Sequence, residues 1–413
     1  MMDIAVMGYG TVGSGVVEVF TKNHDSIVSK SSQADLQLKY ILDLRDFPND
    51  PNSDKFIKDF NIILNDKDVR IVVETMGGLH PAYEYVSALL ESGRSVVTSN
   101  KELIASKGYD LLKIAEDNNV NFLFEASVGG GVPIIRPITQ CLAANEIREI
   151  AGILNGTTNF ILTMMIEEHM SFEDALKLAQ DNGYAEKDPT ADIEGHDACR
   201  KICILASLCF GKHIYPDEVY TEGITKITLE DVAYAANYNS VIKLLGIAKK
   251  MPGGKIAAIV CPCIIKKRSQ LANVNDVFNA ILVKGDATGD VVFYGKGAGK
   301  LPTASAVVAD VIDCAKHINR KKIFGWGPSA ENYVEDHGLI SCAMYIRATS
   351  KDKKTALEEA GNIFGKLTVL ERSGAPEDEF AFITGVDSEN AFREKLSSVK
   401  NFTPCSVIRV TDL

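Results

Sequence analysis

Basic residues are too few in this chain to gather polyanions by charge. Lys and Arg number 44 against 55 Asp and Glu, which gives the 413 residues a formal net charge of −11. Binding to phosphate backbones by charge alone needs an excess of positive charge. We therefore expect no nucleic-acid partner.

Long apolar runs are missing as well. Nowhere do about 18 apolar residues follow one another, as a membrane-spanning helix requires. The first residues, MMDIAVMGYG, run directly into an apolar strand pattern without a basic leader. These absences predict a cytoplasmic protein with no membrane partner.

Cysteine offers no metal or disulfide pattern. The nine cysteines are irregularly spaced, and the one close pair, Cys261 and Cys263, has no second pair or His cluster to complete a zinc site. We expect reduced, mostly buried thiols. The sequence also has no internal repeat and no low-complexity segment.

The chain is long enough and apolar enough to form several domains. Apolar residues make up 46% of the chain, and its length exceeds that at which one hydrophobic core keeps growing. We therefore expect a globular protein of two or three domains.

The amino-terminal segment has the pattern of strand, glycine turn and helix. The apolar run IAVM precedes Gly8, Gly10 and Gly13, and the helical pattern VGSGVVEVF follows. In such a unit the glycines permit the tight turn, the approach of a pyrophosphate and close packing of helix on strand. The helix N-terminus faces the phosphates. Thr11 and Val12, inside this turn, are expected cofactor contacts too.

Further strands alternate with helical stretches over residues 38–44, 69–75, 95–99 and 121–127. This alternation predicts an α/β fold, a Rossmann-type doubly wound parallel sheet that binds its ligand at the carboxyl ends of the strands. We expect a dinucleotide-binding domain over residues 1–132, with Thr98 of the fourth strand among its cofactor contacts.

The choice of dinucleotide depends on the end of the second strand, which reads DLRD. An acid at this place binds the ribose 2′-hydroxyl, and a base accommodates a 2′-phosphate. Arg45 can stack on adenine and hold the phosphate, whereas Asp43 or Asp46 would repel it. We favour NADP and leave NAD open.

Two later strand ends carry charged residues with two interpretations each. Lys101 follows the fourth strand, where it is either an idle surface lysine or a group that shares a proton or grips a carboxylate. Glu125 precedes three glycines and Pro133, which predicts either a plain link between domains or an oxygen-ligand site for a hard cation.

The middle of the chain contains two more polar turns at helix starts. Gly156, Thr157 and Thr158 begin an amphipathic helix, where threonine either caps the helix or faces substrate. A second glycine turn, Gly295, Gly297 and Gly299, precedes a long apolar helix. It either closes over the cofactor from the substrate side or merely starts that helix.

The stretch NGYAEKDPTADIEGHDACRK concentrates charge before and within a helix. Asp197 and Lys201 form an i,i+4 pair where an exposed helix face turns into a buried one. An exposed pair of this kind does little, but in a cleft the lysine can take or return a proton. We interpret His196 beside it as a bystander.

Six motifs in order make the chain resemble homoserine dehydrogenase of the bacterial type over residues 3–315. They are GYGTVGSGVV, ETMGGLHPAYEYVSALLESGRSVVTSNKELIA, FEASVGGGVPIIRP, GILNGTTNFILTMM, GYAEKDPTADIEGHDACRK and GAGKLPTASAVVADVI. The resemblance implies interconversion of L-homoserine and L-aspartate 4-semialdehyde with NAD or NADP, a step toward threonine, methionine and isoleucine.

The resemblance also implies roles for particular residues. Lys201 matches the catalytic lysine that handles the proton, Asp197 its neighbouring acid, and Lys101 the lysine between nicotinamide and substrate. Glu186 matches the glutamate that binds the homoserine amino group, and Asp192 lies in the same loop. A lysine that acts as a base must lose its own proton, so we expect a lowered pKa for Lys201 or an alkaline activity optimum.

In the family a sodium ion is held by Glu125 and the backbone of Val128, Gly130 and Val132, and the turn near Gly297 contacts the cofactor. An α+β domain over residues 133–317 is then expected to carry substrate groups and the contact of a homodimer or homotetramer. Residues 338–413 have a βαββαβ order and look like an ACT domain. Their first loop reads SKDKK in place of an Asp, Pro and Gly cluster, so an effector site and a purely dimerising role both remain open.

Two alternatives compete with this interpretation. An enzyme that oxidises an aldehyde through a thioester needs a cysteine at a helix start, but Cys141, Cys199 and Cys203 lie within helical patterns. A non-enzymatic NADP sensor acting through the tail is the other.

Overall fold

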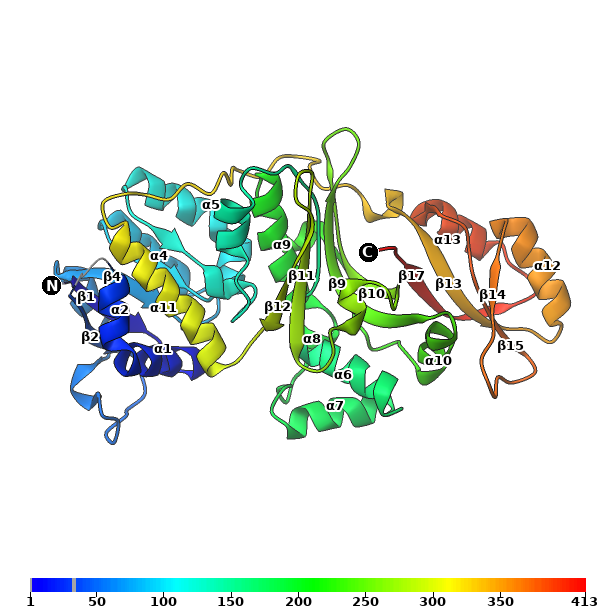
Figure 1. Ribbon diagram of the computed structural model, residues 1–413, viewed down its shortest axis with the longest axis horizontal. Helices are drawn as coiled ribbons and strands as arrows, with labels where there is room; N and C mark the ends of the chain where they lie inside the picture. Colours follow the sequence, from blue (N-terminus) through cyan, green and yellow to red (C-terminus); the bar gives the residue numbers. More distant parts are fainter. Residues whose placement is uncertain (1, 32–34) are drawn as a thin grey trace.

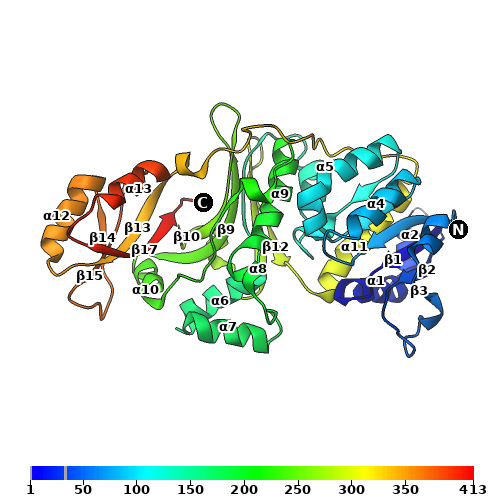
Figure 2. The same ribbon diagram turned by 180° about the vertical axis from the view of Figure 1, so that it is seen from behind.

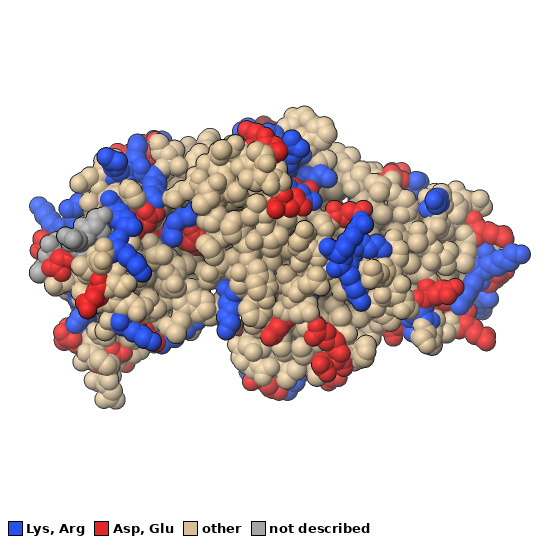
Figure 3. Space-filling model, in the orientation of Figure 1, with Lys and Arg blue, Asp and Glu red and all other residues tan. Residues whose placement is uncertain are grey.

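The computed structural model of the chain describes residues 2–31 and 35–413. The molecule is elongated, with the amino-terminal domain at one end, the tail at the other and the middle segment between them (Figure 1). No helix in these described ranges is both long enough and apolar enough to cross a membrane. Basic and acidic side chains are mixed over the face shown in Figure 3.

The amino-terminal domain contains a parallel sheet of six strands in the order β3-β2-β1-β4-β5-β6. Its strands are β1 (Met2–Met7), β2 (Leu36–Leu42), β3 (Phe56–Ile57), β4 (Val69–Glu74), β5 (Ser95–Thr98) and β6 (Phe122–Leu123). The predicted doubly wound sheet is confirmed. The strand expected over 121–127 is shorter, because the chain enters a 3₁₀ turn at Glu125–Ser127.

Helices cover both faces of this sheet. Successive residues of a strand point to opposite faces, and along the central strands the residues of both faces are buried. Ala5 and Met7 face the helices α3 (Phe60–Asn65), α4 (Ala82–Glu91) and α5 (Lys101–Asp117). Ile4 and Val6 face the other side, which α1 (Thr11–Lys22), α2 (His24–Lys30) and α11 (Lys300–Lys316) cover. Each face of this parallel sheet is therefore buried in an apolar core.

The position of α11 differs from the expected division of the chain. We expected residues 133–317 to stay in the second domain, but α11 returns and packs on α1 of the first domain (Figures 1 and 2). The contact is close: a Cβ on Gly15 would lie 2.8 Å from the carbonyl oxygen of Lys300. The apolar face of α11 therefore completes the core of the nucleotide-binding domain.

The middle segment and the tail share one sheet of eleven strands. Its main path is β12-β11-β7-β9-β10-β17-β13-β15-β14, with β8 paired to β10 and β16 to β13. The strands of the middle segment are β7 (Ile147–Ile153), β8 (Tyr220–Thr221), β9 (Ser240–Lys250), β10 (Ile256–Lys266), β11 (Phe278–Gly285) and β12 (Gly289–Lys296). Those of the tail are β13 (Ser341–Thr349), β14 (Thr368–Leu370), β15 (Glu379–Ile383), β16 (Asp387–Ser388) and β17 (Thr403–Val410).

The junction of the two parts is the parallel pairing of β10 with β17, in which Cys263 is opposite Arg409 and Ile264 opposite Val410. The tail also contains α12 (Lys353–Phe364) and α13 (Glu389–Ser397). The predicted βαββαβ order is present, with the two-residue β16 as an addition. The tail is thus joined to the middle segment by backbone hydrogen bonds.

The helices of the middle segment are α6 (Gly156–Glu167), α7 (Phe172–Asp181), α8 (Thr190–Ile193), α9 (His196–Phe210) and α10 (Leu229–Asn237). Helix α9 packs on β7, β9 and β10. Gly246 of β9 lets it approach, because a Cβ there would lie 3.2 Å from the Cβ of Ile202. Helix α9 also contacts α5 of the first domain. Short 3₁₀ or π turns cover Ser53–Lys55, Pro137–Cys141, Pro216–Glu218, Gln270–Asn273 and His337–Leu339.

A strap of residues 317–336 runs from α11 back along the molecule to the tail (Figure 1). Gly327 exchanges backbone hydrogen bonds with Gly211 and His213, just after α9. The indole N–H of Trp326 donates to Nδ1 of His213 at 3.1 Å. A Cβ on Gly108 of α5 would lie 3.1 Å from the Trp326 ring. Trp326 therefore lies between the first domain and the end of α9.

All nine cysteines are free thiols. Five are buried, Cys209 and Cys342 are partly exposed, and only Cys141 and Cys405 are exposed. This distribution agrees with the expectation of mostly buried thiols.

Candidate active site

The carboxyl ends of β1, β2 and β4 surround a cavity of about 490 Å³. Gly8 and Gly10 line it, together with Asp43, Arg45 and Thr75. Gly8 has a φ of +92°, and a Cβ on Gly13 would lie 1.9 Å from the Gly8 carbonyl oxygen. Side chains at Gly8 or Gly13 would clash with the backbone of the turn. The glycine pattern of the sequence therefore lies at this cavity, where a dinucleotide would bind.

An acid lies at the end of β2, where the ribose of a dinucleotide would bind. Asp43 accepts the backbone N–H of Tyr9 at 2.7 Å and a two-point contact from the Arg45 guanidinium at 2.9 and 3.0 Å. The Arg45 contact lowers the pKa of Asp43 to about 2. Lys58, 2.6 Å from Asp46, lines the same cavity and was not expected from the sequence. The rim therefore contains one acid and two cations.

The three residues expected to handle the proton lie together, although they come from two domains. Lys101 begins α5 of the first domain, and Asp197 and Lys201 lie on consecutive turns of α9. Lys201 Nζ is 2.8 Å from Asp197 Oδ2, and Lys101 Nζ is 2.5 Å from Asp197 Oδ1. One carboxylate therefore joins two lysines across the domain boundary.

Burial and charge give these three groups different pKa values. Burial raises the pKa of Asp197, but the two ammonium groups lower it further, so the carboxylate is ionised. Burial lowers the pKa of Lys201, and Asp197 offsets only part of this effect. Burial also lowers the pKa of Lys101, yet Asp197 more than compensates and the net change is upward. Of the two lysines, Lys201 is thus the one whose pKa is lowered, which agrees with the expected direction.

The segment after β7 contacts both members of the Asp197–Lys201 pair. The carbonyl of Leu154 accepts a hydrogen bond from Lys201 Nζ at 2.8 Å. The side-chain amide of Asn155 donates to Asp197 at 2.9 Å and to Asp192 at 2.7 Å. Asn155 also caps α6, whereas the sequence had offered the threonines that follow it as capping residues. Its position before G-T-T was the available signal.

Two other residues of the charged stretch lie at the surface. Glu186 is exposed, and its carboxylate makes no hydrogen bond with another residue that the structure describes. His196 is exposed at the start of α9. Asp192 is half-buried, and burial raises the pKa of its carboxyl group, with a further contribution from Asp197. The structure thus brings Asp192 into the lysine cluster and leaves the Glu186 side chain exposed at the surface.

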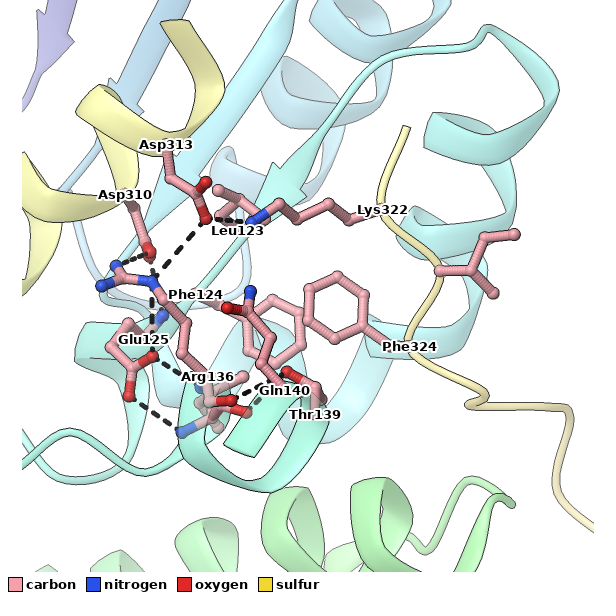
Figure 4. A pocket seen from close by; sticks show the side chains of 12 residues that line it. Leu123, Phe124, Glu125, Arg136, Thr139, Gln140, Asp310, Asp313, Lys322 and Phe324 are labelled. Carbon is pink, nitrogen blue, oxygen red and sulfur yellow. Dashed lines mark hydrogen bonds and ion pairs between the residues drawn. The ribbon is translucent and has the colours of Figure 1, made fainter. Parts of the chain in front are cut away.

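Glu125 lies at the hinge between the first two domains, beside a pocket of about 180 Å³ (Figure 4). Its carboxylate accepts the backbone N–H groups of Ile134, Ile135 and Arg136 at 2.6 to 2.8 Å. The Arg136 guanidinium forms an ion pair with Asp310 of α11, which also accepts the Glu125 backbone N–H. The Glu125 side chain therefore fixes the start of the next turn. No three His, Cys, Asp or Glu side chains in the described ranges are placed to hold a metal ion.

The turn that follows Glu125 is pressed against the second glycine turn. A Cβ on Gly130, whose φ is +55°, would lie 2.3 Å from the carbonyl oxygen of Gly297. The N–H of Gly131 donates to the carbonyl of Lys296 at 3.1 Å. Val128 and Val132 are buried in this turn. The turn containing Gly297 is thus held at the domain boundary, next to the first domain.

A dinucleotide cavity in the first domain, together with a buried lysine and carboxylate at the boundary with the second, is typical of a nicotinamide-dependent oxidoreductase of α/β fold. Comparison with known proteins makes this class specific. Residues 8–125 match the family model described as "Homoserine dehydrogenase, NAD binding domain", and residues 133–312 match the model described as "Homoserine dehydrogenase".

Whole proteins agree with these family models. The chain is 36% identical to the homoserine dehydrogenase of Bacillus subtilis, covering 99% of this chain and 97% of that one. It is 44% identical to that of Neisseria gonorrhoeae, covering 89% and 86%. The crystal structure of a homoserine dehydrogenase from Thiobacillus denitrificans superposes with a TM-score of 0.88 at 33% identity, covering 100% and 98%.

The chain belongs to the homoserine dehydrogenase family. It is therefore an NAD(P)-dependent oxidoreductase that interconverts L-homoserine and L-aspartate 4-semialdehyde. The sensor alternative receives no support from these comparisons.

Proposed function

We propose that Lys201 is the acid–base group of homoserine oxidation. The observation that carries the proposal is the pair of fixed acceptors around its amine, the Leu154 carbonyl and Asp197 Oδ2, each at 2.8 Å. A neutral lysine amine has two N–H donors and one lone pair. When both donors are used in this way, the lone pair is left for the substrate hydroxyl proton. Once protonated, the third N–H can stabilise the oxygen of the aldehyde.

Lys101 has the complementary role in this proposal. Its raised pKa keeps it as an ammonium group, and its side chain is partly exposed at the start of α5 in the cofactor domain. It can therefore hold a substrate oxygen while Lys201 exchanges the proton. A bound nicotinamide supplies the hydride acceptor. Asp192 and Glu186 lie on the segment 182–195, the substrate loop, which precedes α9 and includes α8. They are the proposed partners of the substrate ammonium group.

The test is the variant Lys201→Ala. We expect kcat for L-homoserine oxidation to fall by at least about 10²-fold, the range of a lost acid–base group. Binding of reduced nicotinamide, followed by its fluorescence, should be unchanged because Lys201 does not line the dinucleotide cavity. Retained turnover would show that another group, with Lys101 the first candidate, handles the proton.

We further propose that the chain accepts NADP. The neighbouring structure of a hyperthermophilic archaeal homoserine dehydrogenase is a complex with NADPH, at 28% identity and a TM-score of 0.65. In this chain Arg45, with a side chain 61% exposed, can leave Asp43 for a 2′-phosphate, and Lys58 lies on the same rim. Asp43 then remains available for the 2′-hydroxyl of NAD. Arg45→Ala should raise KM for NADP more than KM for NAD.

Sodium binding is a separate proposal with a restricted set of ligands. The Glu125 carboxylate already accepts three backbone N–H groups and lies 3.8 Å from Arg136 Nε, so it does not fit as a free ligand. The ligands that remain are main-chain oxygens of Glu125, Val128, Gly130 and Val132. Activity compared in sodium, potassium and choline chloride at one ionic strength tests the proposal. Equal rates in all three salts would reject it.

Assembly and location remain proposals as well. We propose a cytoplasmic homodimer or homotetramer in which residues 133–317 carry substrate groups and the subunit contact. Residues 338–413 form an ACT-like regulatory or dimerising domain, which the observed βαββαβ order supports. Light scattering after size-exclusion chromatography tests the assembly, and turnover with and without L-threonine tests the effector.

A further inference from the structure

Asn155 has every hydrogen-bonding position of its side chain in use. It follows β7, is 5% exposed, and caps α6. Its Oδ1 accepts the backbone N–H of Thr158 at 2.8 Å and the Thr158 hydroxyl at 3.0 Å. Its Nδ2 donates to Asp192 Oδ1 at 2.7 Å and to Asp197 Oδ2 at 2.9 Å. A backbone N–H can only donate, so the amide must present its nitrogen to the two carboxylates.

The oxygen that Asn155 contacts is the one that binds Lys201. Asp197 Oδ2 accepts from both Asn155 Nδ2 and Lys201 Nζ, while Oδ1 faces Lys101. The preceding carbonyl, of Leu154, accepts from the same lysine. Two consecutive residues after β7 thus hold both members of the proton-handling pair. A rotation of the Asp197 carboxylate would break the Asn155 contact.

Asn155 also joins the pair to the loop of Asp192. The two carboxylates share one neutral donor, and the charge of Asp197 disfavours ionisation of Asp192. Without a donor between them, like charges would push the loop and the helix apart. The amide is neutral, so it adds hydrogen bonds without changing the charge beside Lys201.

We propose that Asn155 is a positioning residue for the reaction: it fixes the Asp197 carboxylate against Lys201 and ties the substrate loop at Asp192 to that pair. The proposal rests on the proposed role of Lys201. It predicts that changing Asn155 affects both substrate binding and proton transfer, because Asp192 serves the first and Asp197 the second.

The competing explanation is that Asn155 only caps α6. Two substitutions separate the functions because Ser and Asp are both good N-caps. Asn155→Ser keeps a capping oxygen but is too short to reach the carboxylates. Asn155→Asp keeps the shape and the capping oxygen, and loses both N–H donors. If Asn155 only capped α6, both variants would keep the activity of the wild type.

We expect Asn155→Ser to lower kcat for homoserine about 10- to 100-fold and to raise KM for homoserine severalfold, with binding of reduced nicotinamide unchanged. Asn155→Asp adds a negative charge next to Lys201, which favours the protonated lysine. The rise of kcat with pH should therefore move to higher pH in Asn155→Asp, and less in Asn155→Ser. Measuring kcat and KM over pH 6 to 10, the titration range of shifted lysines, gives both the size of each effect and the shift of the pH profile.

Ser171→Ala is the matched control, since it removes the N-cap of α7, whose Ser171 oxygen accepts the Asp174 N–H at 3.1 Å. It should lower the thermal unfolding temperature slightly and leave kcat, KM and the pH profile as in the wild type. If Asn155→Ser behaves like this control, Asn155 is a cap and the proposal is overturned. If Lys201→Ala stays active instead, the acid–base assignment fails, whatever Asn155 does.

Discussion

Arg409, on the last strand of the chain, forms an ion pair with Glu222 of the middle segment, with 2.6 Å between Nη1 and Oε2. The same guanidinium binds Glu389 at 2.8 Å and lies 5.0 Å above the Tyr220 ring. Glu222 precedes a segment that is close to the substrate loop: the N–H of Ile224 donates to the carbonyl of Ile193 at 2.8 Å. The tail is therefore connected to the residue next to Asp192 through a short chain of contacts.

This connection predicts that the tail influences substrate binding. Arg409→Met should raise KM for homoserine about threefold and leave KM for the cofactor unchanged, within the usual range of coupling along such contacts. Arg393→Met is the control, because Arg393 pairs with Glu389 and is 52% exposed without touching Glu222. Equal values of KM for homoserine in both variants would contradict the coupling.

Asp197 is expected to favour the protonated forms of Lys101 and Lys201. Asp197→Asn removes the charge that raises the pKa of Lys101 and of Lys201. Both pKa values should fall, so the rise of kcat with pH moves to lower pH while kcat itself drops about 10²-fold or more. Asp188→Asn, an exposed carboxylate of the same stretch, should leave the pH profile unchanged. A shift toward higher pH in Asp197→Asn would contradict the assignment.

Lys243 makes stability depend on pH in the alkaline range. Its side chain is 1% exposed and donates to the Val274 carbonyl at 2.6 Å, and burial lowers its pKa to about 8. The unfolded chain holds this proton up to about pH 10. The unfolded state therefore binds more protons between these values, and stability rises with pH there.

The comparison with Lys243→Met isolates this effect. Between pH 7 and pH 10 the wild type should gain up to about 3 kcal/mol of unfolding free energy relative to the variant. Thermal unfolding followed at several pH values measures the difference. Lys226→Met, at an exposed position, should show no such gain. A constant difference between wild type and Lys243→Met would mean that the folded protein holds the Lys243 proton as strongly as the unfolded chain does, so that burial does not lower the pKa of Lys243.

Gly297 is predicted to tolerate no side chain. A Cβ there would lie 2.1 Å from Nδ2 of the buried Asn279, on the turn that packs against Gly130. Gly297→Ala should destabilise the protein by about 1–3 kcal/mol, as overpacking does, and should raise KM for the cofactor. Gly361→Ala in α12 meets open space and should be neutral or slightly stabilising. Similar melting temperatures for the two variants would contradict the packing argument.

Local patterns in the sequence were sufficient for much of the fold and part of the site. The glycine turn after β1 and the i,i+4 pair of Asp197 and Lys201 were predicted because backbone geometry alone places such residues together. Lys101 was a candidate with two interpretations. Its contact with Asp197 joins positions 96 residues apart in two domains, and only the packed structure shows it.

The missed features depend on long-range packing in the same way. Lys243 is a charged residue on a strand, so the sequence alone predicts that it faces solvent. In the structure the loop of Val274 covers it and accepts a hydrogen bond from its amine. The Glu125 carboxylate was expected to be free for a cation, but the next turn folds back and supplies three N–H donors. Likewise β17 pairs with β10 across 146 positions, which no local pattern indicates.

Trp326 is the only tryptophan of the chain, and it is buried where the strap crosses α5 and the end of α9. His213, whose ring centroid is 5.4 Å away, has a pKa lowered by burial to about 4, so it stays neutral above about pH 5 and does not change the indole's surroundings there. A movement of α5 relative to α9 changes the polarity around this one indole. The unlabelled enzyme thus carries one intrinsic indole fluorophore at its domain boundary, and we expect its emission to change when the two domains move relative to one another.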